Sequence, residues 1–374
     1  MKYRKFSKTG IPISEISLGA EHLEFEDKKL LLDVVSACID HGINYADFFM
    51  PSPNVRDYMK TALKGRRDKM MVAGHLGAVQ KDGQYERSRD VKKCELYIED
   101  LLTRLDTDYV DMLMLHYIDD ADDAQIVLND GLLALGQRLV RQGKARMLGF
   151  SSHMVMTSQA LIETGSFDSA MFSINPVFDT MNVDTDMDGL FEKEHQQDEI
   201  GQERQAFYRF CETEQCGIVV MKAYGAGRLL DKNSAFPITM TTDQSLEYAL
   251  TRPGVVSVAV GCKSVAEVDA AAAYCEASEQ QRDYSGVIKK ASMATSGFCM
   301  YCNHCLPCPQ NINIAKTIGA IDAMEQGDKG GVRMYEEQSE VDCIACGECE
   351  ERCPFGVEVI DKMQSADDLL DKLS

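Results

Sequence analysis

Short apolar runs of β character alternate with stretches of helical period from the start of the chain to about residue 277. Apolar runs of about four to eight residues bounded by turn residues are typical of buried strands, and apolar residues three and four apart are typical of amphipathic helices. The opening stretch Tyr3–Ser14 alternates and carries a Thr-Gly turn, which predicts a β-hairpin. The predicted strands that follow are Ile16–Ala20, Ile43–Phe48, Met70–Gly74, Val110–His116, Ala145–Ser151, Ser169–Ile174, Gly217–Ala223 and Val256–Gly261.

Helical patterns separate these strands, and Ser88 is the predicted N-cap of one of them. Eight strands that alternate with helices predict an α/β fold, a closed (β/α)8 TIM barrel. An open doubly wound sheet is the alternative, but the opening hairpin and the count of eight strands favour the barrel. The predicted helices include Asp27–His41, Arg89–Leu105, Ile126–Gln142, Gln244–Thr251 and Val265–Ala277.

Eight of the fourteen cysteines lie in two short runs near the C-terminus. The first run reads CMYCNHCLPCP from Cys299 to Pro309, and the second reads CIACGECEERCP from Cys343 to Pro354. Two runs of four cysteines, each closed by Cys-Pro, match the spacing of a two-cluster bacterial ferredoxin, in which the fourth cysteine of each run binds the other cluster. The runs therefore predict two [4Fe-4S] clusters. One would be bound by Cys299, Cys302, Cys305 and Cys353, and the other by Cys308, Cys343, Cys346 and Cys349.

Other uses of these cysteines fit the spacing less well. The first run has two residues instead of three before its last cysteine, which bears on the ligand pairing more than on the presence of clusters. A disulfide scaffold suits a short secreted chain, and zinc sites usually use two separated C-x-x-C pairs. The stretch Ile312–Glu337 between the runs has a helical period, with a turn at Gly327 to Gly331. We therefore predict a barrel over residues 1–285 and an α-helical ferredoxin-like domain over residues 286–374.

Composition narrows the class of protein. The chain has 374 residues, 45% of them hydrophobic and 26% charged, and its formal net charge of −21 argues against a nucleic-acid partner. We expect no membrane span and no targeting segment, because the sequence has neither a long apolar run nor an apolar leader. The six cysteines outside the runs are scattered, as free thiols are in a reducing cytoplasm, and iron–sulfur clusters suit an anaerobic cytoplasmic protein.

Six stretches are spread over the predicted barrel: Tyr3–Ile11, Gly42–Asp47, Asp108–His116, Gly143–Arg146, Gly149–Ser152 and Gly261–Ser264. In this order they resemble motifs of the aldo-keto reductase family. The sequence is most similar to the branch that carries a C-terminal ferredoxin-type domain, so the resemblance covers nearly the entire chain. It implies an oxidoreductase whose site lies at the C-terminal ends of the barrel strands.

The family places an aspartate, a tyrosine, a lysine and a histidine at that end of the barrel, with the tyrosine as the general acid. By this resemblance, Asp47 matches the aspartate and His116 matches the histidine. The tyrosine position falls on Ser52, and the lysine position falls on His75. A serine hydroxyl is too weak an acid to replace a tuned phenol, which speaks against ordinary carbonyl reduction by this tetrad.

Four histidines follow predicted strands and should converge on the mouth of the barrel. Histidine titrates near neutral pH and is a common metal ligand, so these side chains could handle protons or bind a divalent metal. We predict Asp47 as a catalytic residue together with two of the four histidines, His75 and His116. Tyr224 or a histidine is the candidate for the substitute acid. The four histidines are His22, His75, His116 and His153.

A cofactor phosphate is predicted at Lys263 and Ser264, where a helix begins and its N–H groups favour an anion. In the family this site binds the 2′-phosphate of NADP, but Glu267 and Ala271 stand where a basic residue and an asparagine are usual. Asn175 resembles a shorter form of the glutamine that contacts the nicotinamide. Either NADP(H) or FMN would suit these residues. The predicted cofactor-binding residues are Ser151, Ser152, Asn175, Lys222, Lys263 and Ser264.

The sequence thus predicts an iron–sulfur oxidoreductase with a small-molecule substrate at the barrel mouth and a ferredoxin or flavoprotein as electron partner. The alternative is a barrel without catalysis that serves as an electron-transfer or docking subunit of a redox complex. Metal-assisted lyase or hydrolase chemistry with structural clusters is a third hypothesis. The acidic stretch 179–203, which includes a segment that resembles an incomplete calcium loop, is predicted to lie beside the mouth.

Overall fold

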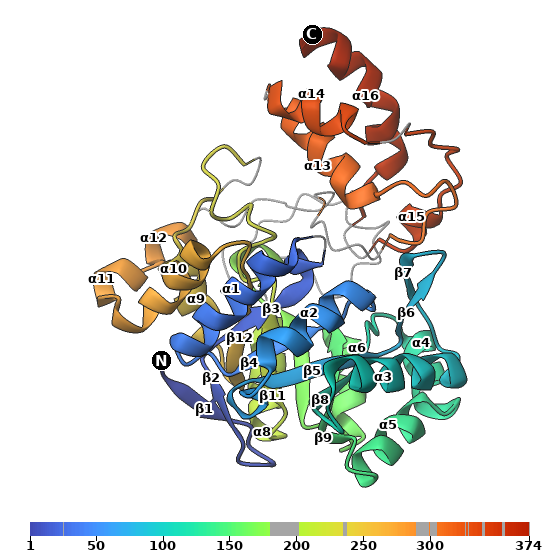
Figure 1. The fold of residues 1–374 in the computed structure, drawn as a ribbon. Helices are drawn as coiled ribbons and strands as arrows, with labels where there is room; N and C mark the ends of the chain where they lie inside the picture. Colours follow the sequence, from blue (N-terminus) through green and yellow to red (C-terminus); the bar gives the residue numbers. More distant parts are fainter. Residues whose placement is uncertain are drawn as a thin grey trace.

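Parallel strands close into an eight-stranded barrel in the described part of the chain, with helices around it (Figure 1). The computed structural model describes residues 1–24, 26–179, 202–234, 238–288, 305–325, 329–338, 341–353 and 356–373, together with Cys299 and Gly327. The barrel strands overlap all eight predicted strands, so the closed barrel is confirmed over the open sheet. They are β3 (Ile16–Gly19), β4 (Tyr45–Phe48), β5 (Met71–Leu76), β8 (Val110–Leu115), β9 (Ala145–Ser152), β10 (Ser169–Ser173), β11 (Gly217–Met221) and β12 (Val255–Gly261).

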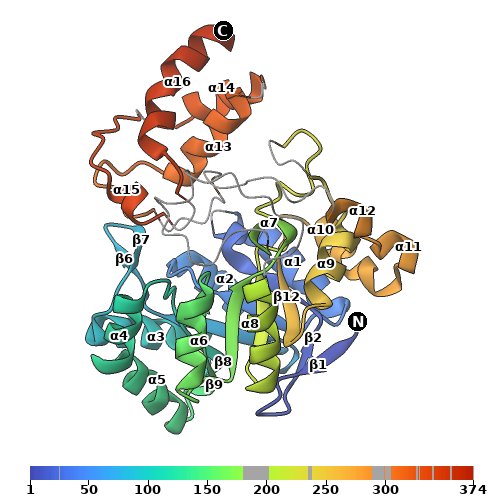
Figure 2. The same cartoon turned by 180° about the vertical axis from the view of Figure 1, so that it is seen from behind.

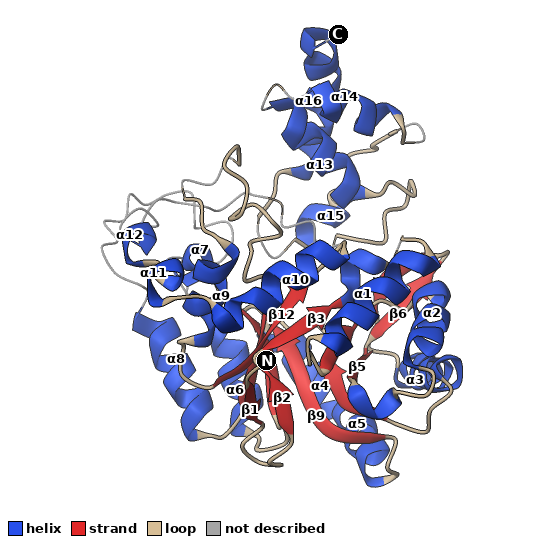
Figure 3. Cartoon of the chain, turned by 60° about the vertical axis from the view of Figure 1, so that its left-hand side comes forward, coloured by secondary structure: helices blue, strands red, loops and turns tan. Residues whose placement is uncertain are grey.

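Neighbouring barrel strands all run parallel, in the order β10-β11-β12-β3-β4-β5-β8-β9. One end is closed by the predicted opening hairpin, whose strands β1 (Tyr3–Lys5) and β2 (Pro12–Ser14) pair antiparallel. Phe6 and Ile13 of this hairpin are fully buried and pack against Tyr45 inside the barrel. Figure 3 shows the hairpin at the end opposite the C-terminal helices. The C-terminal ends of the strands therefore form the mouth.

Helices pack around the outside of the barrel and bury the main hydrophobic core between themselves and the sheet. Their apolar faces follow the helical period that the sequence predicts. They are α1 (Lys28–Asp40), α2 (Pro53–Leu63), α3 (Val91–Leu105), α4 (Ala121–Asn129), α5 (Leu132–Arg141), α6 (Val155–Glu163), α7 (Pro176–Asp179), α8 (Gln202–Thr213), α9 (Thr242–Leu250), α10 (Val265–Ala273), α11 (Glu279–Arg282) and α12 (Ser285–Ile288), with short 3-10 helices at Ala20–Leu23, Arg67–Lys69 and Tyr274–Glu276.

Two local predictions are wrong. The stretch predicted as one helix over Ile126–Gln142 contains parts of two helices, because Gly131 between α4 and α5 takes a positive φ of 101°. The N-cap of α3 is Asp90, whose carboxylate accepts a hydrogen bond from the backbone N–H of Lys93. Ser88 instead accepts a hydrogen bond from the backbone N–H of Asp90.

A second hairpin, which the sequence analysis did not predict, rises from the mouth between β5 and α3. Its strands β6 (Ala78–Lys81) and β7 (Gln84–Arg87) pair antiparallel across Asp82 and Gly83, which both have positive φ. Asp-Gly is a strong signal for such a turn. Figures 1 and 2 both show this hairpin beside the short helix α15 (Glu348–Glu351) of the C-terminal part.

The C-terminal part is helical, as predicted. It contains α13 (Ile314–Glu325), α14 (Lys329–Glu336), α15 and α16 (Val359–Leu373), and the predicted turn lies at Gly327, whereas Gly331 already belongs to α14. Asp322 of α13 forms ion pairs with Lys362 of α16 and with Arg228 of the loop after β11, so this part is tied to the barrel. None of the helices within the described ranges combines the length and apolar character needed to cross a bilayer. The acidic segment 180–201 lies outside the described residues.

Candidate active site

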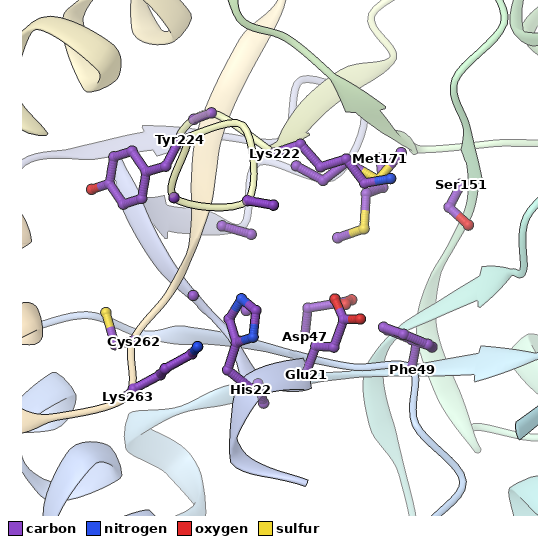
Figure 4. A pocket seen from close by; sticks show the side chains of 18 of the residues that line it. Glu21, His22, Asp47, Phe49, Ser151, Met171, Lys222, Tyr224, Cys262 and Lys263 are labelled. Atoms are coloured by element: carbon purple, nitrogen blue, oxygen red, sulfur yellow. The ribbon is translucent and has the colours of Figure 1, made fainter. Parts of the chain in front are cut away.

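A cavity of about 330 Å³ opens at the mouth of the barrel, among the C-terminal ends of the strands (Figure 4). Its volume is in the range of small-molecule sites. All four histidines predicted at the mouth line it, so the expectation that they converge there is met. Other predicted site residues that line the cavity are Asp47, Ser151, Lys222, Tyr224 and Lys263.

The three predicted catalytic residues form one hydrogen-bonded chain. The carboxylate of Asp47, at the end of β4, accepts from Nε2 of His75 at 2.9 Å. The Nδ1 atoms of His75 and His116 are 2.8 Å apart, and Nε2 of His116 is 2.7 Å from the hydroxyl of Tyr85. All four side chains are buried. Tyr85, on β7, was missed by sequence reasoning because it lies on the unpredicted hairpin and does not follow a barrel strand.

Burial controls the charge of His116 within this hydrogen-bonded series of side chains. Desolvation lowers the pKa of His116 well below its usual value, and the nearby His75, Arg89 and Arg87 lower it further. His116 is therefore a neutral imidazole at physiological pH. A neutral imidazole has one donor and one acceptor nitrogen, so His116 can donate on one side of its ring and accept on the other.

The positions proposed for the general acid lie differently. Ser52, at the family's tyrosine position, begins α2 and does not line the cavity; Phe49 lines it instead. The ring of Phe49 stacks on His116 with centroids 5.2 Å apart. Tyr224 lines the edge of the cavity, but Figure 4 shows its hydroxyl turned away from Asp47. Desolvation raises its pKa well above the ordinary value. Tyr224 is thus poorly placed to deliver a proton there.

A second set of hydrogen-bonded polar groups lies at the cavity, after strands β9 and β11. The carboxylate of Asp119 accepts from Nδ1 of His153 at 2.8 Å, and Nε2 of His153 lies 3.0 Å from Nζ of Lys222. Desolvation lowers the pKa of His153, although Asp119 opposes this shift. His153 therefore stays neutral and accepts from the Lys222 ammonium, which leaves a cation at the end of β11 beside the cavity.

The predicted phosphate site lies at the N-terminus of α10. The Ser264 hydroxyl caps this helix by accepting from the backbone N–H of Glu267 at 3.2 Å. Glu267 accepts from the backbone N–H of Lys263 at 2.7 Å and lines the cavity. A carboxylate therefore occupies part of the positive helix end where an anion would bind.

Three of the predicted cofactor-binding residues do not line the cavity: Ser152, Asn175 and Ser264. Their polar atoms form hydrogen bonds to other groups of the protein. The Ser152 hydroxyl is 3.1 Å from Asp119, and the Asn175 amide donates to the carbonyl of Lys222. Their role in cofactor binding stays a prediction.

Comparison with known proteins agrees with the barrel fold. The model of the Aldo/keto reductase family matches residues 15–242, which is more than half of the chain. The chain belongs to the aldo/keto reductase family. It is an oxidoreductase of the aldo/keto reductase type.

Relatives of this aldo/keto reductase share the barrel at low identity. The uncharacterized oxidoreductase YqkF of Bacillus subtilis is 24% identical over 289 residues, which is 72% of the chain and 89% of YqkF. Aldo-keto reductase AKR11C1 from Bacillus halodurans, in its holo form, superimposes with a TM-score of 0.63 at 20% identity, over 79% of this chain and 97% of that one. An aldo-keto reductase from Klebsiella pneumoniae in complex with NADPH superimposes with a TM-score of 0.54 at 16% identity. The match covers 78% of this chain and 96% of the Klebsiella chain.

The cysteine runs of this aldo/keto reductase lie outside the matched region. Four cysteines, from both runs, line one small cavity together with apolar side chains of α13 and α16. Of the other predicted ligands, Cys302 lies outside the described residues. Within the described ranges, no three His, Cys, Asp or Glu side chains are placed to bind one metal ion. The four cysteines of the cavity are Cys308, Cys343, Cys346 and Cys349.

Arg352 joins the two cysteine runs. Its guanidinium donates to the backbone carbonyls of Cys305 at 3.1 Å and Pro307 at 2.8 Å, and Arg352 itself directly precedes Cys353. The end of the second run is therefore held against the first run, next to Cys305.

Proposed function

We propose that this aldo/keto reductase is an iron–sulfur oxidoreductase of the branch with a C-terminal ferredoxin-type domain. A small-molecule substrate binds at the barrel mouth, and two [4Fe-4S] clusters in the C-terminal domain carry the electrons. The observation that carries this proposal is the small cavity lined by Cys308, Cys343, Cys346 and Cys349. Ligands from both runs around one cavity are what an exchange of fourth cysteines produces.

The residues around the cysteines fit a cluster. Apolar side chains of the helices, such as Ile314 and Met363, line part of the cavity. A four-iron cluster spreads its thiolate ligands more widely than one ion does, so the lack of a site for a single metal ion among the described residues does not argue against a cluster. The second cluster would be bound by Cys299, Cys302, Cys305 and Cys353. When bound, such clusters accept and release single electrons.

The barrel cavity suits a phosphate-bearing cofactor at the α10 end. Lys263 supplies a cation there and Ser264 caps the helix, whereas the carboxylate of Glu267 opposes a 2′-phosphate. The Klebsiella neighbour is in complex with NADPH, which supports NADP(H), and FMN stays the second choice. When bound, a nicotinamide supplies a hydride, and a flavin links hydride pairs to single electrons. Lys222 and Ser151 would line the ring end of this cofactor, and Ser152 and Asn175 would support it indirectly through their hydrogen bonds to Asp119 and to the Lys222 carbonyl.

Proton handling falls to the chain that begins at Asp47. His75 and His116 orient the carboxylate, and neither Ser52 nor Tyr224 is placed to act as the family's tyrosine. We therefore propose that the reaction does not use the usual tyrosine and lysine of the tetrad. The cation of Lys222, held by His153, would bind a carbonyl or carboxylate oxygen of the substrate.

The same proposal covers the domain bounds, the cellular compartment and the electron partner. The barrel occupies residues 1–285 and the ferredoxin-type domain residues 286–374. The cysteines outside the runs are free thiols, five of them buried, which supports a reducing cytoplasm. A small ferredoxin or flavoprotein would exchange electrons at the C-terminal domain, where Cys346 is exposed.

A catalytically inactive barrel that serves as an electron-transfer or docking subunit is the second candidate. The observation that favours it is that both ring nitrogens of His75, and both of His116, are already bonded to protein groups. Identification of bound small molecules on anoxically purified protein separates the two. We expect NADP(H), NAD(H) or FMN to be bound at high occupancy in the wild-type protein. The occupancy should be lower in Lys263→Ala. Protein with clusters but no affinity for any of the three would favour the second candidate.

A further inference from the structure

We infer that Tyr85 is the positioning residue of a proton relay, Tyr85–His116–His75–Asp47, which delivers a proton to the barrel cavity. This inference rests on the proposed function, because it names how that site replaces the family's tyrosine. Tyr85 does not line the cavity, whereas the other three residues do. It acts on the substrate only through them.

The relay has no gap between its two ends. The three contacts are 2.7 Å from Tyr85 to His116, 2.8 Å from His116 to His75 and 2.9 Å from His75 to Asp47. The four side chains are 3%, 3%, 4% and 6% exposed in that order, so water is excluded from the links between them. Each distance is that of a normal hydrogen bond, and a proton can pass along all three.

The contacts allow only one order of protons when both imidazoles are neutral and Asp47 is ionised. Asp47 can only accept, so Nε2 of His75 carries a proton and its Nδ1 is an acceptor. Nδ1 of His116 must then carry the proton between the two rings, which makes its Nε2 an acceptor. The Tyr85 hydroxyl is the donor that satisfies this last nitrogen. Tyr85 and Asp47 therefore fix the same order from opposite ends.

The relay supplies one proton to Asp47 in a balanced sequence of transfers. The Tyr85 hydroxyl proton moves to Nε2 of His116, the Nδ1 proton of His116 moves to Nδ1 of His75, and the Nε2 proton of His75 moves to the Asp47 carboxylate. The neutral Asp47 then gives this proton to a substrate oxygen. Tyr85 is left as a phenolate that regains its proton from solvent, and both imidazoles end neutral but in the other tautomer, which must revert before the next transfer.

The segment Leu306–Asn311, which includes the end of the first cysteine run, contacts the hairpin around Tyr85. Gln84, the neighbour of Tyr85 on β7, donates to the side-chain oxygen of Asn311 at 2.5 Å. Leu306 packs against the small cluster formed by Met50, Ala78 and Tyr85. The far end of the relay is thus positioned by the cysteine-bearing segment, while its near end faces the cavity.

Histidine ¹⁵N NMR of the full-length protein tests this inference without a substrate, because the chain has only seven histidines. We expect His116 in the Nδ1–H form and His75 in the Nε2–H form. In Tyr85→Phe, the His116 Nε2 signal should shift toward that of an imine nitrogen without a hydrogen bond. Tyr45→Phe is the matched control, since the buried Tyr45 hydroxyl has no hydrogen-bond partner within the described part of the chain.

An Nε2–H form of His116 in the wild-type protein would overturn the inference, and this result does not depend on whether Tyr85→Phe folds. A His116 signal unchanged by Tyr85→Phe would overturn it as well. Neither of these results measures the iron content. The NMR result can therefore contradict the relay while the iron assay supports the clusters, and the iron assay can contradict the clusters while the NMR result supports the relay.

Discussion

The hydroxyl of Tyr117 donates a 3.3 Å hydrogen bond to the backbone carbonyl of Arg352. Tyr117 lines the barrel cavity, and Arg352 directly precedes Cys353. A residue of the candidate active site thus contacts the end of the second cysteine run. If clusters occupy the C-terminal part, this contact brings one of them close to the cavity, which is the arrangement that an internal electron transfer needs.

The guanidinium of Arg352 is the first target for mutation, because it holds two carbonyls of the first cysteine run. We expect Arg352→Met to loosen this run and to lower iron content from about eight toward about four atoms per chain, since a two-cluster protein would lose one cluster. Iron and sulfide assays on anoxic protein measure this. Arg333→Met, at an exposed position of α14, is the control. Full iron content in Arg352→Met would refute the role of this clamp.

The carboxylate of Glu267 should set the choice between dinucleotides. It lies in the first turn of α10 and accepts from the Lys263 backbone, so it repels a 2′-phosphate placed there. A charge at a helix end contributes about 0.5–1 kcal/mol, so Glu267→Gln should raise affinity for NADP⁺ relative to NAD⁺ by about two- to fivefold. Calorimetric titration with both nucleotides measures the ratio, with Glu279→Gln on α11 as control. A ratio that stays the same or falls would contradict this prediction.

The buried ion pair between Arg228 and Asp322 should hold the C-terminal helices against the barrel. Asp322→Asn leaves Arg228 and Lys362 without their shared carboxylate, and breaking a buried pair in this way costs about 3–5 kcal/mol. We expect a lower free energy of unfolding in urea and faster proteolytic release of the C-terminal part. Asp361→Asn, an exposed neighbour of Lys362, should behave like the wild type. Equal stability of the two variants would show that the pair is dispensable.

Stability should depend on pH through Glu24. Burial raises the pKa of this carboxyl to about 8, and Glu21 adds to the shift. Between the unfolded value of 4.5 and about 8, the folded state holds a proton that the unfolded state releases. The free energy of unfolding therefore falls as pH rises through this range, by at most about 1.4 kcal/mol per pH unit.

Glu24→Gln removes this dependence. The gain in stability over the wild type should be small at pH 5 and grow up to about pH 8, as measured by urea unfolding across that range. Glu26→Gln, at an exposed position two residues along, should show no such growth. A gain in Glu24→Gln that is constant with pH would mean that the carboxyl is ionised in the folded protein throughout.

The barrel could be predicted from sequence because its strands are buried on both faces and its helices on one. Met112–Leu115 and Ile218–Met221 are continuous apolar runs for this reason. The break at Gly131 was missed, because an apolar period continues across it into α5. The hairpin β6–β7 was missed, although the Asp82-Gly83 dipeptide is a sequence signal for its turn.

Site residues could be predicted from the sequence only where their position along a barrel strand brings them to the mouth. His75 and His116 follow or end barrel strands, so their meeting at the mouth follows from the topology. Tyr85 reaches His116 through an inserted hairpin, and Cys308 reaches the second cysteine run through the packing of helices. Such contacts depend on tertiary structure that no local pattern encodes.

Iron and acid-labile sulfide in anoxically purified protein test the central claim most directly. The account predicts about eight of each per chain. Cys343→Ser should lose a large part of both, whereas Cys275→Ser, a free thiol outside the runs, should lose neither. Protein that contains no iron and no sulfide, or an NADPH-driven aldehyde reductase whose activity is unaffected by Cys343→Ser, would contradict the account.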